Sequence, residues 1–292
     1  MDLEKISIVK LTASSDIYES IKSGFNLIGK PVLDKNSVVA IKPNLCCIKG
    51  PETGATTDPK VVRALIRYLQ DDLHVTNISI VESDGTQLLA DMAFKLLGYD
   101  KISKELNVNL VNLSKAPYAY RAFPENSVLK KVRVPEMLEK TACLISVPKI
   151  KNHSLCTFGV TIKNQYGCNP VARKSAYHSR LHDCMVDLTA VFKPNLVVVD
   201  GLIGMEGRGP IAGIPVKMNT LIFGRDALAV DHLIARLIGV NPNDVEYMKK
   251  AQKRGLGTTK YVVTGASIQE AAHRFNRPPK RSNLYGLFSL RK

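Results

Sequence analysis

A basic stretch in the middle of the chain carries the residue types that are best suited to binding an anion. Between Lys149 and His182 the sequence has six Lys or Arg residues and three His residues, but no Asp or Glu. Positive charge concentrated in this way favours a localised anionic partner over a general role in solubility. We therefore expect Lys149 and Lys151 to hold a carboxylate or a phosphate. His153 would donate or accept a proton, since an unperturbed histidine titrates near neutral pH.

The spacing of apolar residues after His153 predicts a helix over Leu155–Tyr166. Its buried face would consist of Leu155, Phe158, Ile162 and Tyr166. Lys163 lies on another face, where Gly159, one turn earlier, leaves room for a ligand. The free N–H groups at the start of this helix, with the two lysines and His153 close by, would bind an anion. A solvated basic surface is the alternative explanation.

Polar or glycine-rich loops follow four predicted strands. These loops are Lys42–Asn44, Glu82–Gly85, Pro148–His153 and Asp200–Gly201. In a parallel sheet they would converge on one edge, which is where ligands bind in open α/β sheets. There Lys42 could act as a base or a nucleophile, or hold an anion as a simple charge, with Asn44 beside it. A lysine that extends from the sheet edge into solvent is the alternative.

Asp84 and Asp200 are two carboxylates at these strand ends. Either one could orient a lysine, bind a substrate hydroxyl or take part in general acid/base catalysis. Aspartate followed by glycine is also common in turns, so a structural role is the alternative for both residues.

His178 and His182 are four residues apart, a spacing that can bind a metal on a helix. They lie at the edge of the buried stripe of a helix predicted over Ala176–Phe192, so a metal would need further ligands such as His153. We favour contact with an anion or a structural role over a metal site. The following glycine-rich loop, Gly201–Gly213, lacks the spacing of a nucleotide-binding loop. It is either a mobile lid or a structural turn.

Predicted strands and helices alternate along most of the chain, and the strands are continuously apolar. This pattern predicts an α/β fold with a mainly parallel sheet and helices on both faces. We expect a single domain over residues 1–276, with Ala116–Asn126 as a seam between two intimate lobes. A basic tail over residues 277–292 follows, with five Lys or Arg residues and no acid.

The six cysteines include no pair with C-x-x-C spacing, so the sequence shows no zinc ribbon and no built-in iron–sulfur motif. Charges within the first ten residues argue against an export signal, and no apolar run approaches the roughly 20 residues of a membrane helix. We therefore expect a cytoplasmic protein with reduced, buried thiols. Cys156 is the thiol of greatest interest, because it lies inside the basic stretch. The sequence identifies no cofactor.

Several segments together resemble the domain-of-unknown-function 362 family. They are KPN at Lys42–Asn44, TTDP at Thr56–Pro59, SVPKIKNH at Ser146–His153, IKNQYG at Ile162–Gly167, VVDGLIGMEGRGPIAG at Val198–Gly213 and DALAVD at Asp226–Asp231. The resemblance spans about residues 42–257 and implies that the lysines, His153, Asn164 and the Gly209–Pro210 loop belong to one shared pattern. Asn164 and Gly209 are therefore further ligand-binding candidates. Many members of the family carry an added ferredoxin-type module, whose cysteine run this chain lacks. The family's activity is not settled.

Three functions are compatible with these observations. The leading one is an enzyme that acts on a small molecule with a carboxylate or a phosphate, using Lys163 and His153. A nucleic-acid-binding protein is the second, supported by a net charge of +15 and a pI near 9.5. Aromatic residues make up only 6% of the chain and no known nucleic-acid motif occurs, although the basic tail could bind nucleic acid non-specifically. The third, a redox protein with a ferredoxin-like partner, follows only from the family's fusions.

Overall fold

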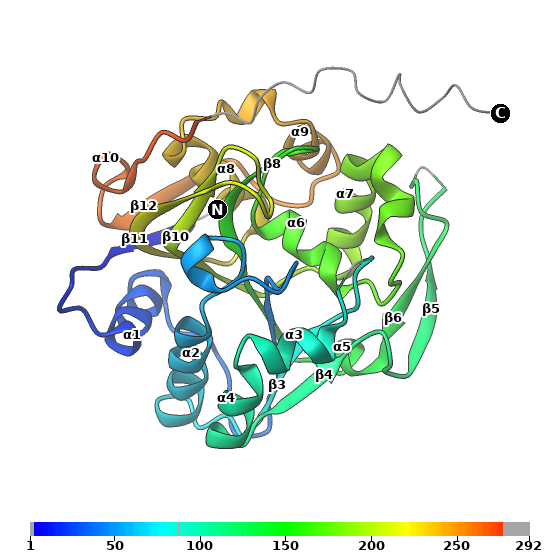
Figure 1. The fold of residues 1–292 in the computed structure, drawn as a ribbon, viewed down its shortest axis with the longest axis horizontal. Coiled ribbons are helices and arrows are strands. Elements are labelled where there is room, and N and C mark those ends of the chain that lie inside the picture. Colours follow the sequence, from blue (N-terminus) through cyan, green and yellow to red (C-terminus); the bar gives the residue numbers. More distant parts are fainter. Residues whose placement is uncertain (1–2, 87, 126, 277–292) are drawn as a thin grey trace.

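One large β-sheet crosses the middle of the molecule (Figure 1). A computed structural model describes residues 3–86, 88–125 and 127–276. Its strands are β1 (Glu4–Lys10), β2 (Val38–Pro43), β3 (Asn77–Glu82), β4 (Asn109–Asn112), β7 (Cys143–Val147), β8 (Lys149–His153), β9 (Thr157–Gly159), β10 (Leu196–Glu206), β11 (Ile214–Gly224) and β12 (Tyr261–Gly265). They follow the order β12-β1-β11-β10-β7-β2-β3-β4, while β8 pairs with β10 and with β9.

Most strands of the sheet are parallel, which confirms the predicted fold class. β10, β7, β2, β3 and β4 are parallel neighbours, whereas β11 runs antiparallel to β10 and to β1. The register places Lys42 beside Ser146 and Ile41 beside Ile80. The carboxyl ends of β2, β3 and β7 therefore meet at one edge of the sheet.

Helices cover both faces of the sheet, as the alternating pattern predicts (Figure 1). On the first face lie α1 (Ile17–Ile28), α2 (Pro59–Asp71), α3 (Ala90–Leu96) and α4 (Tyr99–Leu106). Side chains alternate along a strand, so Val39 and Ile41 of β2 belong to the core on this face and Ala40 to the core on the other. Phe25 of α1 stacks on Tyr68 of α2, with ring centroids 5.0 Å apart.

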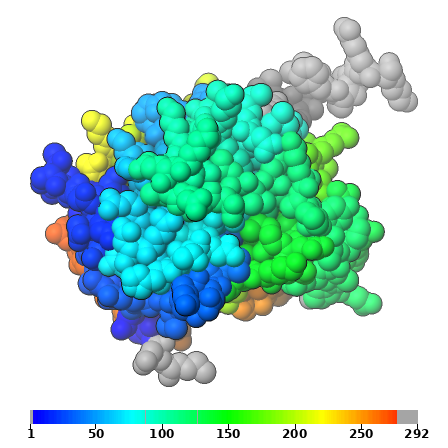
Figure 2. All heavy atoms as spheres, turned by 90° about the horizontal axis from the view of Figure 1, so that it is seen from below, coloured from blue at the N-terminus to red at the C-terminus, as the bar shows by residue number. Residues whose placement is uncertain are grey.

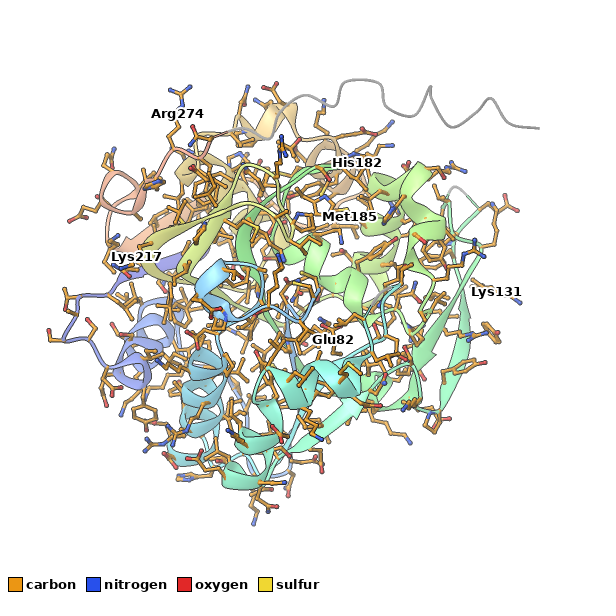
Figure 3. The ribbon with its side chains drawn as sticks, in the orientation of Figure 1. Glu82, Lys131, His182, Met185, Lys217 and Arg274 are labelled. Atoms are coloured by element: carbon orange, nitrogen blue, oxygen red, sulfur yellow. The ribbon has the colours of Figure 1, made fainter. Side chains whose placement is uncertain are left out.

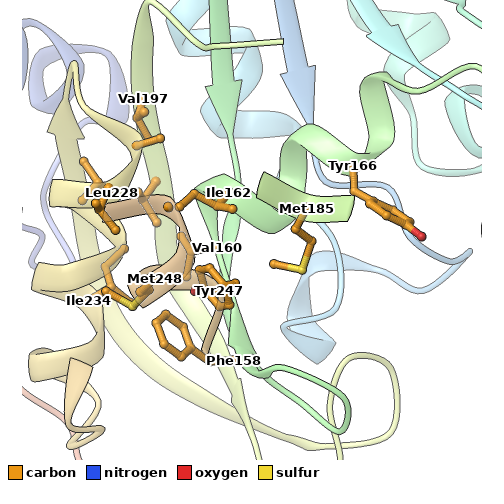
Figure 4. Close-up of a cluster of buried hydrophobic side chains, with 14 of the residues drawn as sticks. Phe158, Val160, Ile162, Tyr166, Met185, Val197, Leu228, Ile234, Tyr247 and Met248 are labelled. Atoms are coloured by element: carbon orange, nitrogen blue, oxygen red, sulfur yellow. The ribbon is translucent and has the colours of Figure 1, made fainter. Parts of the chain in front are cut away.

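A second core lies under the helices of the opposite face (Figure 4). These helices are α6 (Thr161–Gln165), α7 (Leu181–Val191), α8 (Ala227–Leu237) and α9 (Glu246–Lys253), and a short helix α10 (Ile268–Ala271) follows β12. Phe158 packs on Tyr247 with ring centroids 5.9 Å apart. Burial of a large apolar side chain contributes about 1.5–3 kcal/mol, so this core fixes α6 firmly against the sheet.

Part of the segment proposed as a lobe seam, residues 116–126, forms one strand of a separate two-stranded sheet. Its strands are β5 (Tyr118–Ala122) and β6 (Lys131–Pro135), and α5 (Glu136–Glu139) follows. Tyr118 and Tyr120 stay exposed on β5, where the guanidinium of Arg133 lies 4.8 Å from the Tyr118 ring centroid. The division into two lobes stays a prediction.

The start of the basic stretch is a strand and not the approach to a helix. Lys149–His153 forms β8, which turns back into β9 as an antiparallel pair, and α6 begins only at Thr161. The helix predicted over residues 155–166 is therefore wrong in its first half. The two lysines and the histidine of β8 are two residues apart, so they share one face of a strand. The expected anion site at a helix start is wrong as well.

A residue far away in the sequence determines where α6 begins. The carboxylate of Asp231 accepts hydrogen bonds from the backbone N–H groups of Thr161 and Ile162, at 2.7 and 3.1 Å. Asp231 is fully buried, and desolvation raises the pKa of its carboxyl to about 7. Because this helix cap comes from α8, residues 155–166 alone could not reveal it.

Two further segments differ from their predicted form. The glycine-rich loop is shorter than Gly201–Gly213, because β10 continues to Glu206 and pairs with β11 as far as Ile214. The helix predicted over residues 176–192 is divided into a 3-10 helix, Lys174–Arg180, and α7. His178 and His182 therefore lie on different elements.

The first third of the chain and the segment around β5 form most of the face seen in Figure 2. Among the described residues, no helix is both long enough and apolar enough to span a bilayer. The predicted basic tail, residues 277–292, lies outside the described residues.

Candidate functional site

Two adjoining cavities open at the carboxyl edge of the sheet. The first, of about 180 Å³, is lined by residues of β2, β3 and α6 together with Lys174 and His178. The second, of about 750 Å³, reaches from His153 to Pro210. Cys46, Thr86 and His178 line both cavities. We call the two cavities together the cleft.

Two buried lysines beside the cleft are neutralised by carboxylates, and we call Lys42 and Lys149 the compensated lysines. The ammonium of Lys42 lies 2.6 Å from a carboxylate oxygen of Glu82, and that of Lys149 lies 3.1 Å from Asp200. Glu82 lies near the centre of the molecule, whereas Lys131, Lys217 and Arg274 lie near its periphery (Figure 3). Each ammonium already has an ion-pair partner, and the ligand-binding roles expected of Lys42 and Lys149 stay predictions.

Lys151 is buried without a carboxylate partner. Its ammonium donates to Asn44 Oδ1 at 2.6 Å and to the carbonyl oxygen of Ala55 at 2.7 Å, and it lies 3.1 Å from Cys46 Sγ. The first two acceptors are neutral. In the described part of the chain, the Cys46 thiol is thus the one contacting group that can offer this ammonium a negative charge.

Lys163 and Lys174 line the first cavity and also lack carboxylate partners among the described residues. The Lys163 ammonium lies 4.6 Å from the centroid of the Tyr166 ring and has no hydrogen-bond acceptor within that described part. Lys174 donates to Ser83 Oγ at 2.6 Å and to the Asp84 carbonyl oxygen at 2.7 Å. Desolvation lowers the pKa of Lys163 and lowers that of Lys174 to about 8. Together with Lys151 these are the uncompensated lysines.

Two amide side chains hold the strand ends and α6 together. Asn164 Nδ2 donates to the Lys42 carbonyl oxygen and to Ser146 Oγ, each at 3.0 Å. Asn44 Nδ2 donates to Asn164 Oδ1 at 3.1 Å, and Asn44 Oδ1 accepts from Lys151. Both amides line the first cavity. They therefore fix Lys151 and α6 relative to each other.

His153 lines the second cavity as a neutral imidazole. Desolvation, and then the charges of Lys163 and Lys151, lower the pKa of His153 to about 2. Its Nδ1 accepts a hydrogen bond from the N–H of Leu155 at 3.1 Å, so the ring proton is on Nε2. The expected titration near neutral pH is absent, because burial beside lysines disfavours the imidazolium. His153 can still donate a hydrogen bond to a ligand.

Asp84 and Asp200 lie beside the cleft, and neither lines its cavities. Asp84 accepts from Ala90 N and Asn112 Nδ2, at 2.8 and 3.0 Å, and so shapes the loop after β3. Asp200 is fully buried and accepts from Asp58 N at 2.7 Å as well as from Lys149. Their catalytic role stays a prediction, while the contacts favour a structural one. Glu82 lines the first cavity instead, although the sequence did not predict it as a site residue.

Two glycines allow close approaches around the cleft. A Cβ atom at Gly167 would lie 2.6 Å from Lys42 Cε and 2.8 Å from Glu82 Oε1. A Cβ at Gly209 would collide with the carbonyl oxygen of Asn152. Gly209 therefore lets the β10–β11 connection pack against β8, which places Pro210 in the cavity wall.

The two other candidate histidines, His178 and His182, contact different groups. His178 is in the wall of both cavities, whereas His182 stacks on Tyr247 and lies 3.6 Å from Glu246. No group of three or more His, Cys, Asp or Glu side chains in residues 3–86, 88–125 and 127–276 is arranged to hold a metal ion. The two side chains therefore have different surroundings, and the roles expected of them stay predictions.

The thiols divide into two classes. Cys156 and Cys168 are buried, and desolvation raises the pKa of each to about 12, so they are unreactive. Cys46 is exposed and lines both cavities. Interest in Cys156 from its position in the basic stretch was therefore misplaced, and Cys46 is the thiol at the site.

Sequence reasoning missed Glu82, Lys174 and Cys46 as site residues, although signals for two of them exist. Lys174 belongs to the same acid-free stretch as Lys163. Cys46 follows two residues after Asn44, in the loop that the strand β2 leads into. Of the predicted residues, the structure brings Lys42, Asn44, Lys163 and Asn164 together around the first cavity.

Comparison with known proteins agrees with this arrangement of motifs. A thylakoid-associated protein of Synechocystis sp. is 25% identical over 241 residues, which cover 77% of this chain and 70% of that protein. The family described as a domain of unknown function, DUF362, matches residues 39–236, which include β3, β8, α6, all but the first residue of β2, and the residues that line the cleft. This match extends over more than half of the chain, so the protein belongs to the DUF362 family.

Proposed function

We propose that this protein is an enzyme that binds a small molecule with a carboxylate or phosphate group in the cleft, with Lys163 as the main contact to the anion. The observation that carries this proposal is the unpaired ammonium of Lys163 in the first cavity. The Lys163 side chain is half-buried and desolvation lowers its pKa, so its charge is less stable there without an acceptor than in water. A bound anion would supply the missing partner.

The neighbours of Lys163 strengthen the attraction for an anion. Lys174 lines the same cavity and adds positive charge, since its acceptors are neutral oxygens. The Lys151 ammonium lies beside Cys46 Sγ and contributes less to the attraction of a ligand. Glu82 lies in the wall of the first cavity, but its charge is already paired with Lys42. The cavity thus has a net positive character, which favours a ligand of negative charge.

Proton transfer in this enzyme would rely on lysine more than on histidine. The pKa of His153 is about 2, so its imidazole stays neutral and serves as a hydrogen-bond donor. Lys163 and Lys174 have lowered pKa values, which makes either one better able to lose a proton than an ordinary lysine. Asn44 would orient the ligand through its position between β2 and α6.

The first test is the affinity of the Lys163→Met variant for simple anions. Inorganic phosphate and malonate would each be titrated into the protein and followed by calorimetry. A hydrogen bond to a charged group contributes about 1.5–3 kcal/mol, so we expect affinity to fall by roughly 10- to 100-fold. Methionine replaces most of the apolar stem of lysine and removes the ammonium, with its charge and its N–H donors.

The matched control is Lys101→Met, because Lys101 is an exposed lysine on α4 outside the cleft. It removes the same charge and should leave both affinities unchanged. Unchanged affinity in Lys163→Met, an equal loss in Lys101→Met, or no binding of either anion to the unaltered protein at millimolar concentration would contradict the proposal.

The two other functions receive less support. Non-specific binding of nucleic acid was expected from residues 277–292, which lie outside the described residues. A redox role with a ferredoxin-like partner stays a prediction. The cytoplasmic location likewise stays a prediction.

A further inference from the structure

Cys46 occupies an unusual position for a thiol in this molecule. It is exposed, it lines both cavities, and it follows directly from the loop that ends β2. The residue is exposed at the cavities, while its Sγ contacts two buried groups, Lys151 Nζ at 3.1 Å and the Ala55 carbonyl oxygen at 3.5 Å. Cys143, Cys156, Cys168 and Cys184 are all buried by comparison.

The charges around Cys46 favour its thiolate form. Lys151 Nζ lies 3.1 Å from Sγ, and its other acceptors, Asn44 and Ala55, are neutral oxygens. The adjacent Cys47 Sγ lies 3.9 Å from Cys46 Sγ. The hydrogen bond with Cys47 and the nearby Lys151 ammonium lower the pKa of Cys46 well below its ordinary value, although burial of the sulfur opposes them.

A second polar group faces the same cavity without a partner. His153 is only 8% exposed, and its Nδ1 is occupied by the N–H of Leu155. Its Nε2–H has no acceptor among the described residues, yet the side chain lines the second cavity together with Cys46. The Nε2–H is open to the second cavity and not sealed in the core, so a ligand oxygen there can accept a hydrogen bond from it.

We propose that Cys46 is a nucleophilic residue that attacks the carbonyl carbon of a substrate whose carboxylate or phosphate is held by Lys163. The Sγ electron pair forms the S–C bond, the carbonyl π pair moves onto the oxygen, and the oxygen takes a proton from solvent water. The product is a thiohemiacetal, and its formation needs no oxidant or other reactant. The Nε2–H of His153 is the neutral donor available to that oxygen. The anionic part of this substrate class rests on the proposed function, whereas the reactivity of Cys46 does not.

The first experiment tests whether Cys46 is present as a thiolate in the unaltered full-length protein. Limiting iodoacetamide would be added at several pH values, and the alkylated cysteines would be located by peptide mass mapping. In this reaction the S–C bond forms and iodide leaves with the C–I electron pair. We expect Cys46 to react at least about 10-fold faster than Cys47 near pH 7, with a midpoint of the rate below about pH 8.5. Equal rates for the two cysteines, or a midpoint at or above the ordinary thiol value, would overturn the assignment of Cys46.

The anionic part is tested by comparing iodoacetate with iodoacetamide on the same protein. Iodoacetate carries the carboxylate that Lys163 would hold, so Cys46 should prefer it over the neutral reagent. The preference should disappear in Lys163→Met, while the rate with iodoacetamide falls less, because Lys163 also contributes to the lowered pKa of Cys46. Fast reaction with iodoacetamide and no preference for iodoacetate would overturn the anion site and keep Cys46 as the nucleophile.

Two variants distinguish the effect of Lys151 on the reactivity of Cys46 from the effect of Cys47. Lys151→Met should slow the reaction of Cys46 with both reagents, because the ammonium that stabilises the thiolate is gone. Cys47→Ser keeps a hydrogen-bond donor and should leave Cys46 fast. A slow Cys46 in Cys47→Ser, with Lys151→Met unchanged, would overturn the part given to Lys151.

Discussion

The compensated and the uncompensated lysines lie at the same edge of one sheet but differ in what surrounds their charges. Lys42 and Lys149 each meet a buried carboxylate, at 2.6 and 3.1 Å. Lys163 has an aromatic ring as its contact and no acceptor within the described residues. A paired lysine contributes to the fold, whereas an unpaired one carries a cost that a ligand can relieve.

The strand ends at the cleft therefore carry lysines with two roles, pairing with internal carboxylates and attracting a ligand. Glu82 and Asp200 hold Lys42 near the end of β2 and Lys149 at the start of β8 through buried ion pairs. The uncompensated lysines lie near these ion pairs. Lys151 and Lys174 donate to neutral oxygens, and Lys163 belongs to α6. We infer that positive charge is kept available for a ligand because the internal carboxylates are already used.

The largest effect is expected where a compensated lysine loses its partner. Asp200→Asn keeps the shape of the side chain and leaves the buried Lys149 charge unpaired, which should lower the free energy of unfolding by about 3–5 kcal/mol. Urea denaturation followed by circular dichroism would measure it. The control, Asp91→Asn, breaks the exposed pair with Lys115 and should cost at most about 1 kcal/mol. A small effect of Asp200→Asn would remove the distinction between the two sets of lysines.

A smaller effect of the opposite sign is expected when an uncompensated charge is removed. Lys163→Met should leave the free energy of unfolding unchanged or raise it by up to about 1 kcal/mol, because no ion pair is lost. The same urea denaturation measures it, in buffer without phosphate. A loss above about 2 kcal/mol would show that Lys163 has a structural partner and would weaken the comparison.

The pH dependence of anion binding gives the smallest expected effect. Burial lowers the pKa of Lys174 to about 8, so its ammonium is charged below this pH and becomes neutral above it. Only the charged form attracts an anion, so malonate affinity should fall as pH rises through about 8, by up to about 10-fold per lysine lost. Calorimetry near pH 7 and pH 9 would detect the change. In Lys174→Met the decrease should be shallower, and an affinity that rises with pH would contradict this account.

The fold class was predictable because continuous apolar strands and intervening helices are local patterns. The convergence of Lys42 and Asn44 at the sheet edge also followed, since parallel strands end on one side. Residues 149–153 show where local reasoning failed. Lys149, Lys151 and His153 recur at every second position, which is typical of a strand. The spacing of the apolar residues that follow nevertheless favoured a helix.

The remaining errors come from contacts between segments distant in sequence. The cap that Asp231 gives α6 joins residues about 70 positions apart. Whether Asp84 or Glu82 faces the cavity depends on the register of β3, and the pairing of lysines with carboxylates depends on β8 lying beside β10. The neutrality of His153 arises from burial and nearby lysines, which its residue type alone does not indicate.

The most direct test of the central claim is the position of a bound anion in crystals soaked with selenate, located by anomalous diffraction from selenium. Selenate has the shape and charge of a phosphate-like ligand. The account predicts a peak in the first cavity within hydrogen-bond distance of Lys163 Nζ, and its loss in Lys163→Met crystals. Peaks only at exposed lysines, with the first cavity empty or Lys163 paired to an internal carboxylate, would contradict it.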